Sequence, residues 1–352
     1  MPANYSTRPW EGFLPKVEMI FLNRRSLLVK AILVCVGLWL TVPQKLYAEP
    51  LVVGYSSVTS VFLPFWIGNE AGFYKKEGLD AQLIYIASST TMAQAMFARQ
   101  VAISTVNSGS VVTSTLQGGD LVLMGAVMNA AAFYIITRPE IINVQDLKGK
   151  KIGVTRLGSS SDFAVREYLQ KNKLQPNRDV SIVQIGGMPE LAAALNNGSI
   201  SAAPLSSPSS YVAEQKGNRV IANLANEGIY FVIAGLTTTR RFLREQRSEA
   251  KAFLRAFGRA THFMFQQPDA AKRILTKYAK IDDPGMLEGS LKYAHDFTEK
   301  IPMVKREGVQ VVLDQEAVKN PQAKDATTER FYDNSLVQEL INEGFYKSLW
   351  SK

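Results

Sequence analysis

A hydroxyl-rich loop in the middle of the chain carries the residue types that bind anions. Ile152–Thr155 is predicted to form a short buried strand, which Leu157–Ser161 cannot continue, and apolar residues at helical spacing begin at Ala164. A helix start presents unpaired backbone N–H groups and a partial positive charge, so it attracts anions. Arg156 adds a formal charge to the loop. The alternative is that one serine simply caps the helix. Three consecutive serines exceed what a cap requires, which favours a role in ligand binding.

The same pattern occurs 99 residues earlier in the chain. GYSSVTSVFLPFW begins at Gly54 and GVTRLGSSSDFAV begins at Gly153, and Asp80 is likewise followed at that offset by Asp179. The stretch Ala93–Val112 aligns without gaps over the residues 99 positions later. Since each unit has the length of a domain, the repeat indicates a duplicated α/β lobe and not a solenoid.

Each copy alternates predicted strands with predicted helices, which indicates a mainly parallel sheet with helices on both faces. Open sheets of this kind bind ligands at the carboxyl ends of their strands, and two facing lobes form a cleft for a small ligand. Six short loops rich in hydroxyl groups or glycine follow the predicted strands: Ser56–Ser60, Ala87–Thr90, Asn107–Ser110, Thr155–Ser161, Gly186–Pro189 and Ser206–Ser209.

The N-terminal region has the layout of a secretory signal. Basic residues at Arg24, Arg25 and Lys30 precede the apolar run Ala31–Val42, and Ala48 offers a small residue for cleavage. We expect residues 1–48 to be a signal peptide, with Met19 as an alternative start that would leave 1–18 untranslated. An uncleaved anchor is the alternative, although twelve apolar residues are short for a membrane span. The sequence leaves both the general and the twin-arginine export routes open.

Composition excludes several classes of function. The chain carries a net charge of +9, which falls to about +5 after residue 48, without the basic and aromatic runs typical of nucleic-acid binding. Its single cysteine, Cys35, lies inside the apolar run, so the mature chain has no thiol chemistry. The two histidines, His262 and His295, match no metal or catalytic motif. The sequence therefore predicts no enzyme activity, no cofactor and no metal site.

Two further motifs, LPFWIGNEAGFYKKEGLD (Leu63–Asp80) and DLKGKKIGV (Asp146–Val154), resemble the extracytoplasmic substrate-binding proteins of ABC importers. The most similar group takes up nitrate, sulfonates, taurine and thiamine-pyrimidine precursors. The resemblance extends from about Leu51 to about Leu275. It implies a type II periplasmic-binding-protein fold, in which two α/β lobes joined by two crossing strands close on a ligand, with a helical C-terminal tail.

The resemblance also implies a division of the chain. The expected parts are a signal peptide at 1–48, lobe 1 at 49–131 and 231–352, lobe 2 at 132–230, and crossing strands at Ala132–Ile141 and Tyr230–Thr239.

The candidate ligand contacts are the hydroxyl and amide side chains of the loops, Arg156, and two aromatic residues of the crossings. They are Ser57, Thr59, Ser89, Thr90, Asn107, Ser108, Phe133, Arg156, Ser159, Ser160, Ser161, Ser206 and Tyr230. Relatives often carry acidic residues at the positions of Ser201 and of Ser206–Ser209, where they would pair with a ligand amine. Their absence, with Arg156 as the expected charge-recognising residue, favours an anionic or neutral ligand.

We therefore expect a monomeric solute-binding protein outside the cytoplasmic membrane, which captures a small anion and delivers it to an ABC permease and ATPase. One alternative is a sensor module that docks on a receptor. Another is an enzyme of thiamine-pyrimidine synthesis, which is disfavoured because fungal relatives use a cysteine-rich segment that the mature chain lacks.

Overall fold

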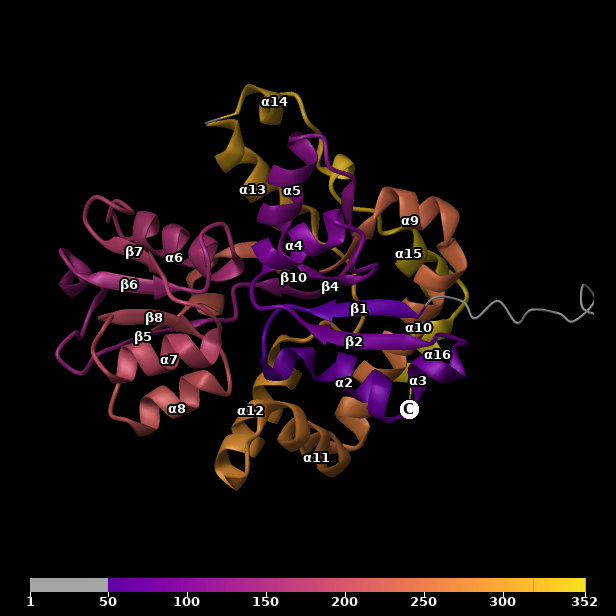
Figure 1. The fold of residues 1–352 in the computed structure, drawn as a ribbon, viewed down its shortest axis with the longest axis horizontal. Helices are drawn as coiled ribbons and strands as arrows, with labels where there is room; N and C mark the ends of the chain where they lie inside the picture. Colours follow the sequence, from indigo (N-terminus) through magenta and orange to yellow (C-terminus); the bar gives the residue numbers. More distant parts are fainter. Residues whose placement is uncertain (1–49, 319, 352) are drawn as a thin grey trace, which may run out of the picture. The chain divides into compact units, whose positions relative to one another are not determined.

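The computed structural model describes residues 50–318 and 320–351 (Figure 1). The predicted signal peptide and Cys35 lie outside these residues. Within the described ranges, no helix combines the length and the apolar character that crossing a membrane requires.

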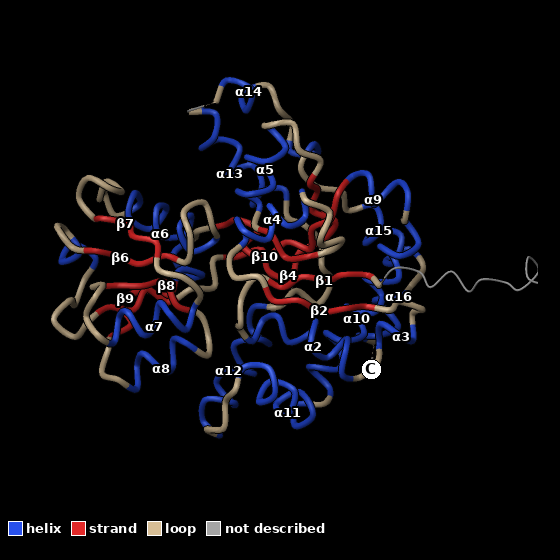
Figure 2. The backbone as a smooth tube through the Cα atoms, viewed as in Figure 1, coloured by secondary structure: helices blue, strands red, loops and turns tan. Residues whose placement is uncertain are grey.

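Lobe 2 contains a five-stranded sheet whose strands are all short (Figure 2). In spatial order the strands are β7 (Ser181–Gln184), β6 (Lys151–Val154), β8 (Ala202–Leu205), β5 (Tyr134–Thr137) and β9 (Arg219–Asn223). The helices that connect them are η2 (Val144–Leu147), α6 (Ser160–Lys171), α7 (Met188–Asn196) and α8 (Ser209–Gln215), followed by η3 (Leu224–Glu227).

Lobe 1 has the same strand order in two hydrogen-bonded groups. One group pairs β2 (Ala81–Tyr85) with β1 (Leu51–Tyr55), and the other has the order β3 (Ser104–Val106), β10 (Tyr230–Thr239) and β4 (Leu121–Ala130). A parallel bridge between Val53 and Ile103 joins the two groups. The connecting helices are η1 (Ser60–Phe62), α2 (Leu63–Glu70), α3 (Phe73–Lys76), α4 (Ser89–Phe97) and α5 (Ser108–Leu116).

The 99-residue repeat of the sequence is confirmed by the elements. Shifted by 99 positions, α4 has the bounds of α7, and β2, β1, β3 and β4 fall on β7, β6, β8 and β9. Gly54 and Gly153 occupy equivalent places in β1 and β6. A Cβ atom would lie 2.6 Å from Met92 Sδ at Gly54 and 2.6 Å from Ile200 Cδ1 at Gly153, so both sheets are packed too closely there for a side chain.

One strand in each sheet runs against the other four. In lobe 2, β5 pairs antiparallel with β8 and β9, and in lobe 1 β10 pairs antiparallel with β3 and β4. Each of these strands enters its lobe from the other lobe, and therefore from the cleft side. The other four strands of each sheet run toward the cleft. The sheets are therefore mainly parallel, as expected.

Two segments cross between the lobes. Ala131–Phe133 leads from β4 into β5, and Gly228–Ile229 leads from η3 into β10. The two crossings contact each other, because Ala131 N donates to Ile229 O at 3.4 Å. The strand predicted at Ala132–Ile141 is shorter in the structure, where β5 covers Tyr134–Thr137, whereas the strand predicted at Tyr230–Thr239 coincides with β10. We propose that the lobes divide in these segments, at the boundaries expected from the sequence.

The C-terminal region is helical, as expected. Its helices are α9 (Arg240–Glu245), α10 (Arg247–Gln266), α11 (Pro268–Ala279), α12 (Pro284–Phe297), α13 (Arg306–Ala317), α14 (Pro321–Lys324), η4 (Thr328–Arg330), α15 (Ser335–Asn342) and α16 (Phe345–Trp350). Phe253 and Phe257 of α10 are fully buried, and their rings lie 6.0 and 5.4 Å from the ring of Phe65 in α2, so the tail completes the core of lobe 1.

Candidate functional site: a hydroxyl-lined cavity between the lobes

A cavity with about 540 Å³ of empty space, including its opening to solvent, lies between the two lobes. This volume is within the range of small-molecule sites. The polar lining residues are Ser56, Ser57, Thr59, Ser88, Ser89, Thr155, Ser159, Ser160, Ser161, Gly187 and Ser206. The apolar and aromatic lining residues are Val61, Phe62, Met128, Ala132, Phe133, Met188, Ile233, Ala234 and Tyr293.

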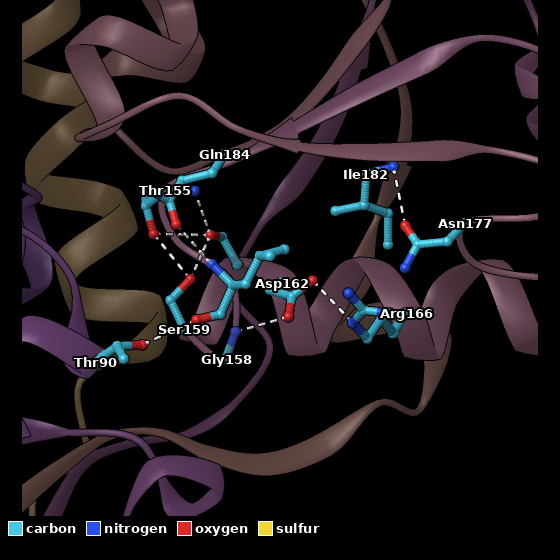
Figure 3. Close-up of polar contacts among 11 residues, drawn as sticks. Thr90, Thr155, Gly158, Ser159, Asp162, Arg166, Asn177, Ile182 and Gln184 are labelled. Atoms are coloured by element: carbon cyan, nitrogen blue, oxygen red, sulfur yellow. Dashed lines mark hydrogen bonds and ion pairs between the residues drawn. The ribbon is translucent and has the colours of Figure 1, made fainter.

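Three buried hydroxyl groups form a cluster in the wall from lobe 2 (Figure 3). Thr155 Oγ1 donates to Ser159 Oγ at 2.9 Å, and Ser161 Oγ lies 2.9 Å from Ser159 Oγ and 3.0 Å from Thr155 Oγ1. Thr155 N also donates to Ser161 Oγ at 2.9 Å. Because hydroxyl protons rotate, this cluster is able to donate to a ligand acceptor or to pair internally.

Three helices begin at the cavity. The N-cap residues Ser88 of α4, Ser159 of α6 and Gly187 of α7 all line it, and each of these helices has nine or more residues. Ser159 and Gly187 make no side-chain cap, so neither occupies the first N–H groups of its helix. In α7, Pro189 has no N–H group, and the carboxylate of Glu190 lies beside Gly187. Ser88 adopts φ 81°, a backbone conformation that a non-glycine residue holds only at a cost in free energy. The helix starts give the cavity a positive electrostatic character.

Uncharged side chains form the whole lining, and Tyr293 is the one lining residue with an ionisable group. Burial raises the pKa of the Tyr293 phenol well above its usual range, so the phenol is neutral at physiological pH. Asp162 lies in the first turn of α6, where its carboxylate accepts from Gly158 N at 2.8 Å and pairs with Arg166 Nε at 2.9 Å. The neighbouring arginine therefore compensates the negative charge nearest to the hydroxyl cluster. Among the described residues, His, Cys, Asp and Glu nowhere form a group of three that could hold a metal ion.

Ser160 connects the lobes through three hydrogen-bonding contacts. Its Oγ accepts from Asn107 Nδ2 at 3.2 Å, donates to the carbonyl of Ile233 in β10 at 2.8 Å, and lies 3.3 Å from Ser89 Oγ. Asn107, Ser89 and Ile233 all belong to lobe 1, whereas Ser160 is the first residue of α6 in lobe 2. This arrangement makes Ser160 the centre of direct contact across the cavity.

Further hydrogen bonds cross between the lobes at the edges of the cavity. Thr59 Oγ1 donates to Ser207 O at 2.8 Å, and Thr90 Oγ1 donates to Leu157 O at 3.2 Å. Ser110 Oγ donates to Gly158 O at 3.2 Å. The hydroxyl-rich loops therefore bind one another as well as surrounding the cavity.

The structure brings most of the sequence-predicted contacts together. Eight of them line the cavity: Ser57, Thr59, Ser89, Phe133, Ser159, Ser160, Ser161 and Ser206. The Oγ atom of Ser57 is buried without a hydrogen-bond partner among the described residues, which leaves it available to a ligand.

Three predicted contacts are not lining residues, and their side chains form hydrogen bonds within the protein. Asn107 caps α5, accepting from Ser110 N at 2.6 Å, and reaches the cavity only through Ser160. Thr90 bonds to the loop at Leu157, as described above. Ser108 donates to Gly308 O at 3.0 Å and therefore faces α13.

Arg156 and Tyr230 are not brought to the cavity. Both are exposed, Tyr230 at 59%, and neither is among the lining residues. The expectation that Arg156 recognises the charge of the ligand is therefore not met by this geometry. The carbonyls of Leu157 and Gly158 in the same turn accept hydrogen bonds from lobe 1, whereas the side chain of Arg156 is exposed to solvent.

We expect Arg156→Ala to weaken the binding of an anion less than about fivefold, because exposed charges contribute at most about 1 kcal/mol. Isothermal titration of the variant and the wild type with the same anion measures the difference. A loss of tenfold or more would show that the guanidinium reaches the ligand after all.

The sequence predicted Phe133 but no other residue of the apolar part of the site. Met128, Ile233 and Ala234 belong to long apolar strands, and Phe62 follows the first hydroxyl loop, so each has the pattern of a core residue. Tyr293 lies in the helical C-terminal tail, where the sequence predicted no ligand contact. No local signal separates these residues from ordinary core positions.

The fold is that of the periplasmic binding proteins, whose solved structures resemble this one. A protein of Bordetella bronchiseptica RB50 has a TM-score of 0.75 and 21% identity, covering 85% of this chain and 99% of its own. The periplasmic nitrate-binding protein NrtA of Synechocystis PCC 6803 has a TM-score of 0.68 and 14% identity, with coverages of 84% and 89%. The periplasmic aliphatic sulphonate binding protein SsuA of Escherichia coli has a TM-score of 0.63 and 18% identity, with coverages of 77% and 86%.

The chain belongs to the NMT1/THI5-like family, since that family's model matches residues 59–271. The resemblance drawn from the sequence motifs is thereby confirmed. NrtA and SsuA are binding proteins by name, and this chain shares their fold.

Proposed function

We propose that this protein captures a small anionic solute in the cavity between its lobes, outside the cytoplasmic membrane, and delivers it to an ABC importer. The observation that carries the proposal is the convergence of three helix starts and of hydroxyl groups from both lobes on one cavity without carboxylates in its lining. Backbone N–H groups and hydroxyls donate to an oxyanion, and the helix dipoles favour negative charge.

The energetics are consistent with a solute-binding protein. A micromolar dissociation constant corresponds to about 8 kcal/mol. Several charge-assisted hydrogen bonds of roughly 1.5–3 kcal/mol each, together with burial of apolar ligand surface, reach that range. We propose that rotation about the two crossings opens and closes the cavity, so that only the closed form satisfies a ligand from both sides. The name of SsuA supports a sulfonate as the first anion to test, and that of NrtA supports nitrate.

Matched probes test the sign of the ligand charge. We expect benzenesulfonate to raise the melting temperature in a concentration-dependent manner. At a ligand concentration a hundred times its dissociation constant, binding adds about 2.7 kcal/mol to the free energy of unfolding. Benzenesulfonamide has nearly the same shape without the charge, and benzylamine carries the opposite charge. Differential scanning fluorimetry compares the three, with nitrate and benzoate as further anions.

Stabilisation by the amine or the sulfonamide, without any by the anions, would contradict an anionic ligand. Native mass spectrometry of the purified protein provides an independent check, because a co-purifying solute is identified by its mass.

A further inference from the structure

Tyr293 of α12 belongs to the cavity wall although it lies far along the chain from every other lining residue. Its side chain is 4% exposed and its ring packs against Phe297 at 4.8 Å and against Tyr134 of β5 at 6.0 Å between centroids. The helix that carries it packs against η1 in lobe 1, and Ser290 Oγ lies 2.8 Å from Ser207 Oγ in lobe 2. Thus α12 contacts both lobes beside the cavity (Figure 1).

The hydroxyl group of Tyr293 donates a hydrogen bond to the carbonyl of Ala132, in the middle of the first crossing. The neighbouring carbonyls of that crossing have backbone donors. Ala131 O accepts from Phe133 N at 2.8 Å, and Phe133 O accepts from Leu224 N at 2.8 Å. Ala132 is 1% exposed and also lines the cavity, so its carbonyl has Tyr293 in place of water.

The hydrogen bond leaves the ring of Tyr293 as the part that a ligand contacts. Phe62 and Phe133 contribute further aromatic surface to the same lining. A bare oxyanion such as nitrate makes no use of this surface, whereas an anion with an aromatic or aliphatic portion buries its apolar part there.

We infer that Tyr293 is a specificity-determining and positioning residue of the binding site, selecting an organic anion by its ring and holding the first crossing by its hydroxyl. The inference rests on the proposed function for the class of ligand. It adds that occupancy of the cavity and the conformation of the crossing are coupled through one side chain.

Two variants separate the two roles. Tyr293→Phe keeps the ring and removes the hydroxyl, whereas Tyr293→Ala removes both. Tyr293→Leu replaces the alanine variant if that variant does not fold. Tyr346→Phe is the matched control, because Tyr346 is also buried, at 1% exposure, and its hydroxyl has no partner among the described residues.

The ring is tested by selectivity. Benzenesulfonate and methanesulfonate carry the same charged group, so the ratio of their dissociation constants cancels any general effect on closure. We expect the wild type and Tyr293→Phe to prefer benzenesulfonate equally, and Tyr293→Ala to reduce the preference about fivefold or more. An unchanged ratio in Tyr293→Ala, or a wild type that prefers methanesulfonate, would overturn the role in specificity.

The hydroxyl is tested without a ligand. Hydrogen–deuterium exchange of the amides at 131–134 should accelerate severalfold in Tyr293→Phe and stay unchanged in Tyr346→Phe. Equal exchange in Tyr293→Phe and the wild type would overturn the positioning role. If the wild type binds neither sulfonate, nor the other anions tested above, the proposed function fails, while the exchange experiment still decides whether Tyr293 holds the crossing.

Discussion

Replacement of Ser89 by aspartate should reduce the affinity for an anionic ligand about a hundredfold or more. Ser89 is 4% exposed, lines the cavity and is the first residue of α4, so the new carboxylate lies where the helix start would attract the ligand. Two like unit charges 4 Å apart repel by about 4 kcal/mol at an effective dielectric constant of about 20. The helix itself tolerates the change, because an acidic residue in the first turn is favourable to the helix dipole.

Ser89→Asn is the matched control for this charge. Asparagine has the size of aspartate, so both variants lose the contact of Ser89 with Ser160 and add the same bulk. Isothermal titration with benzenesulfonate measures the two affinities, and thermal unfolding confirms that each variant is folded. Equal affinities of the two variants for benzenesulfonate, or tighter binding by the aspartate variant, would show that the negative charge of the ligand does not lie at the start of α4. Either outcome contradicts the proposed role of this helix start.

Replacement of Ser160 by alanine should weaken ligand binding roughly tenfold to a hundredfold. The substitution removes the three contacts that Ser160 makes with Asn107, Ile233 and Ser89 in the opposite lobe. A hydrogen bond contributes about 0.5–1.5 kcal/mol net, and a buried partner left unpaired costs about 1–3 kcal/mol. The proposed rotation of the lobes would separate these residues, so the loss should fall on the closed form. Small-angle scattering should therefore show a larger radius of gyration at the same ligand concentration.

Ser199→Ala is the control for the serine-to-alanine change. Ser199 lies in lobe 2 on the exposed surface, and its Oγ donates to Asn197 Oδ1, two residues away. This variant should bind and scatter like the wild type. If Ser160→Ala also matched the wild type in affinity and in scattering, the contacts at Ser160 would have no part in closure.

Much of the fold is determined by local sequence pattern. The 99-residue repeat, the glycines at 54 and 153 and the alternation of short strands with capped helices are all visible in the printed chain, and the structure has elements at the corresponding positions. These features are local because the hydrophobic period and the turn residues act over a few positions. The loops at the strand ends were predictable for the same reason, since parallel strands end at one edge of a sheet.

The sequence did not show which side chain of a loop faces the cavity. Ser159 and Arg156 belong to the same short loop, yet Ser159 is 1% exposed in the wall and Arg156 is exposed at the surface. Ser108 and Asn107 are adjacent in sequence, but one bonds to α13 and the other to α6. The direction of a side chain in an irregular loop depends on backbone dihedral angles, which composition and spacing do not specify.

The amino-acid sequence by itself therefore determined the duplicated α/β architecture, the family and the hydroxyl-rich character of the site, because these follow from patterns within one element or between neighbouring elements. Only the tertiary structure decided that the site lacks charged side chains in its lining and that Tyr293 completes it. The hydrogen bond from Tyr293 to Ala132 joins residues 161 positions apart. Contacts over such separations arise from the packing of whole elements against each other, and the periodicity of the sequence does not predict them.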